Sequence, residues 1–166
     1  EIKFHVKHSI KNKFDVAVVG GGHAGIEAAI VAAQMGMQTA LITMEINKIG
    51  LMSCNPAIGG LAKGQLVREI DALGGVMGKI SDIAGIHFKM LNTSKGPAVQ
   101  SPRAQADRAY YAKVAQLFIL NTKRLTVIEG TAVSIQVKRH SVKKLYLNNG
   151  EQIDVKAIVL TNGTFL

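Results

Sequence analysis

One short motif limits what this chain can fold into: the glycines of residues 20–25, spaced G-x-G-x-x-G, stand between an apolar run and an alanine-rich run. Residues 14–19 (FDVAVV) are typical of a buried strand, and residues 23–35 have the composition of a helix. Residues 39–43 (TALIT) indicate a second strand. Strand, helix and strand in such a short stretch predict one βαβ unit with parallel strands and a right-handed connection.

The glycine spacing has a chemical reason. Gly20 permits a tight turn, Gly22 removes a side chain where a diphosphate would approach the backbone, and Gly25 lets the helix lie close to the strand. The N-terminus of the helix then offers amide N–H groups and its positive dipole end to phosphates. The motif predicts a dinucleotide-binding site, with a glycine-rich turn that binds nothing as the alternative.

FAD and NAD bind to the same kind of loop, so the motif alone leaves the dinucleotide open. An acidic residue that binds the ribose is expected about 20 residues beyond the loop. Glu45 has that spacing, but the predicted strand ends at Thr43, where the acid normally stands. Glu45 is therefore either the ribose ligand or an exposed loop charge. No Arg follows the strand, which disfavours a cofactor with a 2′-phosphate.

The middle of the chain is expected to be helical, with an irregular insert. The run NPAIGGLAKGQLVREIDALGG predicts a loop and then a helix that its last two glycines end. Residues 76–101 contain several helix-breaking Gly and a Pro, and we expect irregular structure there. Pro102 is expected to open a long helix that runs to about Leu120, because proline is favourable at a first helical position.

From Leu125 the apolar period changes to two, which predicts strands, and Asn149-Gly150 indicates a hairpin turn. We expect a small antiparallel meander that crosses over to a final buried strand at residues 157–161. This order resembles the FAD domain of glutathione-reductase-type flavoproteins, and Thr161-Asn162-Gly163 resembles their second glycine motif. The sequence thus predicts an α/β fold: a Rossmann-like FAD-binding domain whose parallel sheet has a β-meander crossover, incomplete at its C-terminus.

The composition limits the class of protein, its cellular location and the kinds of partner that it can bind. The 166 residues suffice for one domain, and no apolar run is long enough to span a bilayer. No signal peptide opens the chain, so we expect a cytoplasmic protein. The single cysteine allows no internal disulfide and no zinc spacing, and no metal site is visible. The net charge of +9 is concentrated in residues 1–13 and 138–144, which are either solvated segments or contacts to a polyanion.

Several longer strings resemble one family. FDVAVVGGGHAGIEAA, MSCNPAIGGLAKGQLVREIDALGG, GIHFKMLNTSKGPAVQSPRAQADR and VLTNGTFL are similar to the N-terminal part of the MnmG (GidA) family, over residues 14–166. The resemblance implies an FAD-dependent enzyme that works with the GTPase MnmE. Together they add a (carboxymethyl)aminomethyl group to C5 of the wobble uridine of tRNA, using methylenetetrahydrofolate, with NADH reducing the flavin. It also implies a homodimer.

The resemblance also implies a domain layout. Residues 1–13 are expected to form a basic N-terminal extension, and residues 14–166 the N-terminal part of the FAD-binding domain. The family's NADH-binding insertion and its C-terminal helical domain, which docks MnmE, are not represented in this sequence. By itself such a piece is expected to be inactive.

The same resemblance assigns residues. The predicted diphosphate loop consists of Gly20, Gly21, Gly22, His23, Ala24 and Gly25. Val133 matches a position whose backbone contacts the adenine, with Ala132 as the neighbouring alternative. Cys54 matches a cysteine proposed to act in catalysis. Asn55, Lys95 and Arg103 lie in shared strings and are expected to line the flavin cleft.

Cys54 has a chemical rationale of its own. It precedes Asn55-Pro56, where we expect a helix to start, and a helix N-terminus favours the thiolate. A thiolate could add to C6 of uridine and make C5 nucleophilic, or could carry a one-carbon unit. The alternative is a small buried hydrophobic side chain beside the cofactor.

Three other functions stay open. The chain could be a different FAD-dependent oxidoreductase of this fold, or a folate-dependent tRNA uridine methyltransferase. It could also be a non-catalytic module that binds a nucleotide or RNA.

Overall fold

The computed structural model describes residues 12–163, so the predicted extension at residues 1–13 lies almost wholly outside the described residues. The chain divides into two compact units, which we call the sheet unit (Glu1–Ile49 with Ile119–Leu166) and the hairpin unit (Gly50–Phe118). Helix α4 (Arg108–Asn121) runs from the hairpin unit into the sheet unit.

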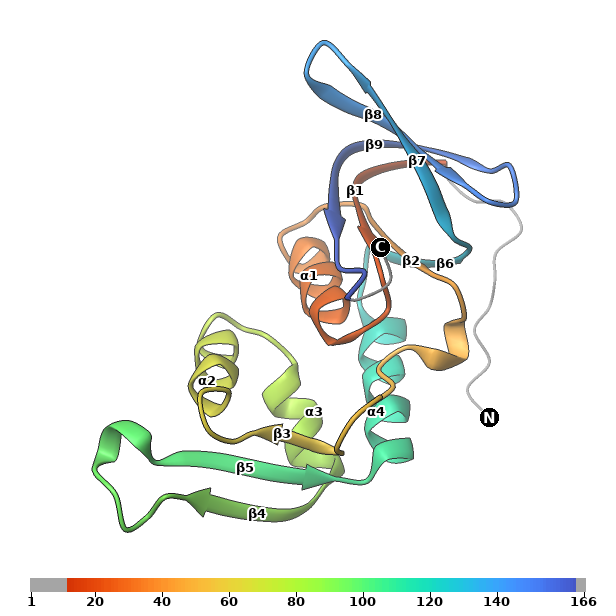
Figure 1. Cartoon of the computed structure of the whole chain (residues 1–166). Coiled ribbons are helices and arrows are strands. Elements are labelled where there is room, and N and C mark those ends of the chain that lie inside the picture. The colour runs from red at the N-terminus through yellow and green to blue at the C-terminus, as the bar shows by residue number, and fades with distance from the viewer. Residues whose placement is uncertain (1–11, 164–166) are drawn as a thin grey trace. The chain divides into compact units, whose positions relative to one another are not determined.

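The sheet unit contains the predicted βαβ motif (Figure 1). Its elements are β1 (Lys13–Val19), α1 (His23–Gln34), β2 (Thr39–Thr43), the 3-10 turn η1 (Ile46–Lys48), β6 (Leu125–Glu129), β7 (Ala132–Lys138), β8 (Ser141–Leu147) and β9 (Gln152–Leu160). They form a six-stranded sheet in the order β6-β2-β1-β9-β8-β7. Strand β1 pairs in parallel with both β2 and β9, so the parallel arrangement predicted from the motif is confirmed.

Helix α1 packs on β1 and β2 through its small and branched residues. The residues buried along it are Gly25, Ile26, Ala29, Ile30 and Ala33. Gly36 follows the helix at a φ of +94°, the left-handed conformation that glycine adopts most easily after a helix C-terminus. The predicted end of the helix is therefore confirmed.

The meander differs from the prediction in two respects. Strand β9 is continuous over nine residues and belongs to both parts of the sheet. Its first half pairs antiparallel with β8, and the strand also runs parallel to β1. No separate final strand follows a crossover within the described residues. The predicted burial of that strand is wrong as well, because Val159 is 39% and Leu160 55% exposed.

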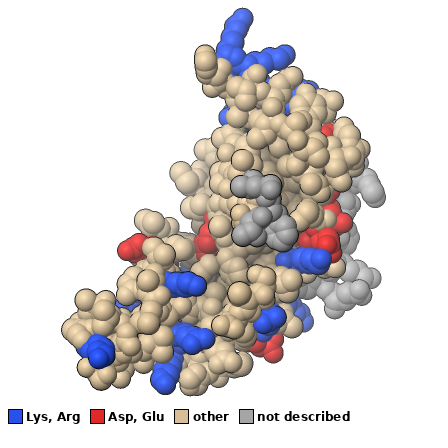
Figure 2. All heavy atoms as spheres, in the orientation of Figure 1, with Lys and Arg blue, Asp and Glu red and all other residues tan. Residues whose placement is uncertain are grey.

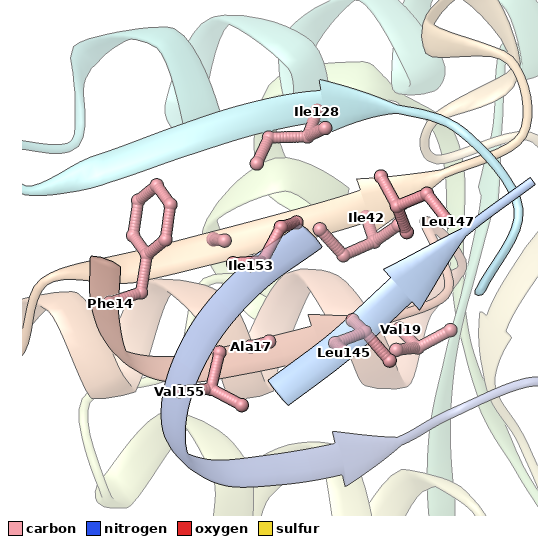
Figure 3. Close-up of a cluster of buried hydrophobic side chains, with 10 residues drawn as sticks. Phe14, Ala17, Val19, Ile42, Ile128, Leu145, Leu147, Ile153 and Val155 are labelled. Atoms are coloured by element: carbon pink, nitrogen blue, oxygen red, sulfur yellow. The ribbon is translucent and has the colours of Figure 1, made fainter. Parts of the chain in front are cut away.

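A cluster of apolar side chains lies between the parallel strands and the meander (Figure 3). Its fully or nearly buried members are Phe14, Ala17, Val19, Ala40, Ile42, Ile128, Leu145, Leu147, Ile153 and Val155. The neighbours of Ala17 and Ile42 in sequence, Val18 and Leu41, point to the opposite face of the sheet and are also fully buried. Strands β1 and β2 are thus covered on both faces over most of their length, which explains their nearly continuous apolar sequences.

The hairpin unit is built on a three-stranded antiparallel sheet in the order β3-β5-β4. Its elements are β3 (Ala57–Gly59), α2 (Gly64–Ala72), α3 (Met77–Ala84), β4 (Gly85–Leu91), the 3-10 turn η2 (Pro97–Val99) and β5 (Ser101–Ala106). The predicted helix is α2, and Gly74 ends it at a φ of +89°. The prediction that residues 76–101 are irregular is wrong, since α3 and β4 occupy most of that segment.

The predicted start of the long helix is also wrong. Pro102 lies in β5, opposite Met90, and α4 begins only at Arg108. Asp107 explains the difference, because its Oδ1 accepts a hydrogen bond of 2.8 Å from the N–H of Tyr110. Its carbonyl accepts another, of 2.9 Å, from the N–H of Tyr111. An aspartate N-cap thus sets the start of the helix five residues after the proline that we expected to open it.

Candidate cofactor-binding site

The turn between β1 and α1 is held by close backbone contacts. The N–H of Gly20 donates to the carbonyl of Ile42 at 2.8 Å, and Gly20 has a φ of +114°. A Cβ at Gly20 would come within 2.5 Å of the carbonyl oxygen of Thr161. A Cβ at Gly25 would overlap the carbonyl oxygen of Gly20 itself. Both positions therefore exclude any side chain, for the steric reasons that the motif predicted.

Gly22 is different, because nothing lies within 4 Å of the place where its Cβ would stand. Its φ of −76° is one that any residue adopts. The backbone at Gly22 thus borders open space, and the missing side chain leaves room for a group that approaches from outside. Gly21 is packed more closely, since its Cβ would lie 2.9 Å from Oγ1 of Thr43.

The N-terminus of α1 opens beside this space. Gly22 is its N-cap, and within the described chain no side chain caps the helix and no acid stands in its first turn. The first-turn amides and the positive end of the helix dipole therefore meet no protein carboxylate there. Ala24 is exposed in this turn. Uncapped amides beside open space can accept an anionic group such as a phosphate.

Thr161 fastens this turn to the end of β9. Its Oγ1 donates a hydrogen bond of 2.8 Å to the carbonyl of Val19, and the carbonyl of Gly20 lies 3.3 Å away. Its backbone N–H also reaches the carbonyl of Val19, at 2.9 Å. A Cβ on Gly25 would meet the same hydroxyl at 2.8 Å. The resemblance of residues 161–163 to a second glycine motif does not by itself disclose this contact, because about 140 residues separate the two segments.

His23 occupies the first position of α1. Its ring is partly buried, and burial lowers the pKa of His23 below its usual 6.5 because the charged imidazolium loses hydration. The side chain therefore stays neutral near the helix N-terminus. A neutral ring leaves the backbone amides as the source of positive potential in the loop.

The other residues predicted in the sheet unit lie after β2 and at the start of β7. Glu45 follows β2 and is exposed, with its carboxylate 2.6 Å from Nζ of Lys48. Glu129 ends the adjacent strand β6, and its Oε2 accepts a hydrogen bond of 3.3 Å from the N–H of Ile46. Val133 lies in β7 with 59% of its surface exposed, after half-buried Ala132. The ribose and adenine roles of Glu45 and Val133 stay predictions.

Cys54 belongs to the hairpin unit and is exposed. The prediction that it precedes a helix is wrong, because the short strand β3 comes next and α2 begins only at Gly64. The helix N-terminus invoked to favour its thiolate is therefore absent. Its carbonyl oxygen accepts a hydrogen bond of 2.7 Å from Nη2 of Arg108. The segment is held by its backbone, and its thiol is open to solvent.

The remaining candidates of the hairpin unit are also exposed. Lys95 lies in the loop between β4 and β5, where its N–H donates to the carbonyl of Asn92 at 2.9 Å. Arg103 lies in β5, whereas Arg108 begins α4. The predicted helix from Pro102 would have placed both on one helix, so that placement of Arg103 is wrong. Asn55 is exposed beside Cys54.

Two further findings concern the part of the chain from residue 12 to residue 163. No three His, Cys, Asp or Glu side chains gather there in a way that could hold a metal ion. None of the helices there is both long and apolar enough to cross a membrane. The basic segment 138–144 closes the β7–β8 hairpin, with Arg139 and His140 at positive φ in the turn.

Comparisons with known proteins agree with this architecture. The family described as glucose inhibited division protein A matches residues 15–166. A tRNA uridine 5-carboxymethylaminomethyl modification enzyme MnmG of Zymomonas mobilis is 55% identical over 157 residues, which are 95% of this chain and 25% of that protein. The chain thus spans about a quarter of the length of such relatives.

Solved structures give the same result for the fold. The structure of Aquifex aeolicus GidA superposes with a TM-score of 0.90 at 55% identity, covering 93% of this chain and 26% of that one. Pseudomonas aeruginosa PqsL, named a probable FAD-dependent monooxygenase, has a TM-score of 0.63 at 14% identity, covering 88% and 41%. The second likeness shows only a shared fold. The predicted α/β class is confirmed, and the chain belongs to the glucose inhibited division protein A (GidA, MnmG) family.

Proposed function

We propose that this chain forms the diphosphate-binding part of an FAD-dependent enzyme that modifies the wobble uridine of tRNA. The product would be a (carboxymethyl)aminomethyl group at C5, as the name of the Zymomonas mobilis relative indicates. The observation that carries the proposal is the open space beside Gly22 at an uncapped helix N-terminus. Family membership supports the choice of FAD and of tRNA.

The residues of the sheet unit would bind and orient the cofactor. Backbone amides at Gly22, His23 and Ala24 would donate to the diphosphate, while Gly20 and Gly25 keep the turn tight against the sheet. Thr161 would hold the turn in place. Glu45 would bind the adenosine ribose, and the backbone at Val133 the adenine. When bound, FAD supplies reversible transfer of electron pairs, with NADH as the reductant.

The hairpin unit would supply the chemistry on the substrate side. Cys54 is an exposed thiol, accessible to a substrate without unfolding of the chain. Its proposed role is to form a covalent bond to uridine or to a one-carbon unit from methylenetetrahydrofolate. The proposed partners are tRNA, the GTPase MnmE and a second copy of the protein in a homodimer. The proposed location is the cytoplasm.

Replacing Gly22 by alanine separates cofactor binding from folding. The new methyl group would meet no atom of the chain, so we expect an unchanged unfolding midpoint. It would occupy the space proposed for the diphosphate, so we expect FAD affinity to fall at least tenfold. FAD binding is measured by quenching of flavin fluorescence. Gly96→Ala is the matched control, since Gly96 also has open space around its Cβ position and lies outside the loop.

Equal FAD affinity of Gly22→Ala and Gly96→Ala would contradict the proposed diphosphate site. The reaction itself is tested with a full-length protein that contains this chain, incubated with tRNA, MnmE, GTP, methylenetetrahydrofolate, glycine and NADH. Nucleoside analysis should detect the modified uridine with the wild type and not with Cys54→Ser. Flavin binding with unmodified tRNA would instead favour a different FAD-dependent oxidoreductase.

A further inference from the structure

Two cations stand directly opposite each other in the hairpin unit. Lys89 in β4 pairs in register with Arg103 in β5, and both residues are exposed. Directly opposite residues of an antiparallel pair extend from the same face of the sheet, with Cβ atoms about 5 Å apart. On the other side of Arg103 the register partner is Gly59, which has no side chain. The face thus carries two adjacent positive charges beside bare backbone.

This pairing is unfavourable for the fold. Like charges directly opposite each other in a sheet are destabilising. Residues 85–106, which form the β4–β5 hairpin, contain Lys89, Lys95 and Arg103 but no Asp or Glu. Within the described part of the chain, none of these three cations forms an ion pair with an acid. Unfavourable local arrangements such as two uncompensated like charges occur chiefly at functional sites, where a ligand can supply the opposite charge.

The shape of the hairpin indicates what kind of anion fits. Strands β4 and β5 form a long arm of the hairpin unit (Figure 1), and Lys95 lies in the loop that joins them. Lys and Arg side chains stand out on the face that Figure 2 shows. Exposed cations give each anion little burial, so useful affinity needs several contacts at once. A phosphodiester backbone offers such contacts, whereas a compact anion does not.

We propose that the Lys89–Arg103 pair is a phosphate-binding site for the backbone of an RNA substrate, extended toward the loop by Lys95. A phosphate between the two side chains replaces their repulsion by two attractions. The pair contributes affinity and positions the RNA, and it reads no sequence. This inference rests on the proposed function, because it assigns the surface by which the tRNA is held.

The test compares tRNA binding by wild type, Lys89→Gln and Lys113→Gln, measured by fluorescence anisotropy of labelled tRNA over a range of salt concentrations. Lys113 is an exposed lysine of α4 outside the hairpin, so its variant has the same net charge as Lys89→Gln. We expect Lys89→Gln to weaken binding at least fivefold and to reduce the slope of log affinity against log salt by about 0.9. We expect Lys113→Gln to change the affinity less than twofold.

A second measurement tests the repulsion without RNA. Lys89→Glu places opposite charges across the strand pair, so its thermal midpoint should rise above the wild-type value while its tRNA affinity falls further. Equal tRNA binding by Lys89→Gln and Lys113→Gln would overturn the proposal, as would a Lys89→Glu midpoint no higher than that of the wild type. So would a Lys89-dependent midpoint increase with inorganic pyrophosphate but no Lys89-dependent binding of tRNA, which would assign the site to a small phosphate compound. The flavin measurements on Gly22→Ala judge the proposed function separately.

Discussion

The turn at residues 20–25 in the sheet unit and the segment around Cys54 in the hairpin unit were both predicted functional elements, but they are built very differently. In the first, Gly20 and Gly25 touch backbone atoms so closely that no side chain fits. In the second, Ser53, Cys54 and Asn55 are all exposed, and the main chain is held by Arg108. A glycine that close backbone contacts require shows in the sequence as part of a motif. The exposure of a reactive side chain such as that of Cys54 does not, because it depends on which residues surround the side chain in the fold.

The largest expected effect is the loss of stability when alanine replaces a closely packed glycine, and it should differ between the two units. Gly25→Ala places a methyl group onto the carbonyl oxygen of Gly20, which directly follows the residues of β1 that pair with β9. We expect a loss of more than about 4 kcal/mol in the free energy of unfolding, measured by urea denaturation. Gly64→Ala in the hairpin unit mainly meets the side-chain hydroxyl of Ser101, and the nearest backbone atom, the carbonyl oxygen of Pro102, is 3.0 Å away. The hydroxyl can turn away only by giving up its hydrogen bond to the carbonyl of Gly60, so we expect a measurable but smaller loss. A larger loss in Gly64→Ala than in Gly25→Ala would contradict this expected difference between the units.

A smaller effect is expected at the hydroxyl that holds the turn. Thr161→Val keeps the side-chain shape but removes the hydrogen bond to Val19, which should cost about 1 kcal/mol in the free energy of unfolding. If Thr161 also positions the loop, FAD affinity should fall in Thr161→Val and be restored in Thr161→Ser. Unchanged FAD affinity in the valine variant would reduce Thr161 to a structural role.

The pH dependence should single out His23 at the same turn. Its folded-state pKa lies below 6.5, so the unfolded chain binds the proton more readily as the pH falls through that value. Stability should therefore be highest above pH 6.5 and decrease below it, and His23→Gln should flatten this decrease in urea denaturation. Asp15, whose pKa is lowered from 3.8 by its hydrogen bonds to Lys156 and Gln38, acts in a separate and more acidic range. An unchanged slope in His23→Gln would show that another group causes the decrease.

The smallest effect on stability is expected at Cys54. Because the side chain is exposed, Cys54→Ser should change the free energy of unfolding by less than about 0.5 kcal/mol. The folded wild-type chain should react with a thiol-specific reagent as fast as its unfolded form. A strongly protected thiol, together with a large loss of stability in the serine variant, would support the alternative of a buried hydrophobic side chain.

The two units also differ in how well the sequence predicted them. In the sheet unit, β1 and β2 are apolar runs and a glycine turn separates β1 from α1, so β1, α1, β2 and the start of the meander follow from local patterns. In the hairpin unit, β4 is exposed along most of its length and shows no clean alternation. Its strand character comes from pairing with β5, so residues 76–101 were predicted to be irregular. The cap at Asp107 was a local signal that the prediction overlooked in favour of Pro102.

The sequence by itself determined the βαβ unit, the glycine turn and the family, because helix periodicity and the absence of a side chain act over a few residues. Only the tertiary structure decided that Thr161 closes the turn from the far end of the chain, that β9 serves two parts of one sheet, and that Lys89 faces Arg103. Each of these depends on how strands pair in the folded sheet, and Thr161 and β9 also join segments that are far apart in sequence. The register of a strand pair depends on the hydrophobic pattern of both strands and on the geometry of the turns, and no single residue sets it.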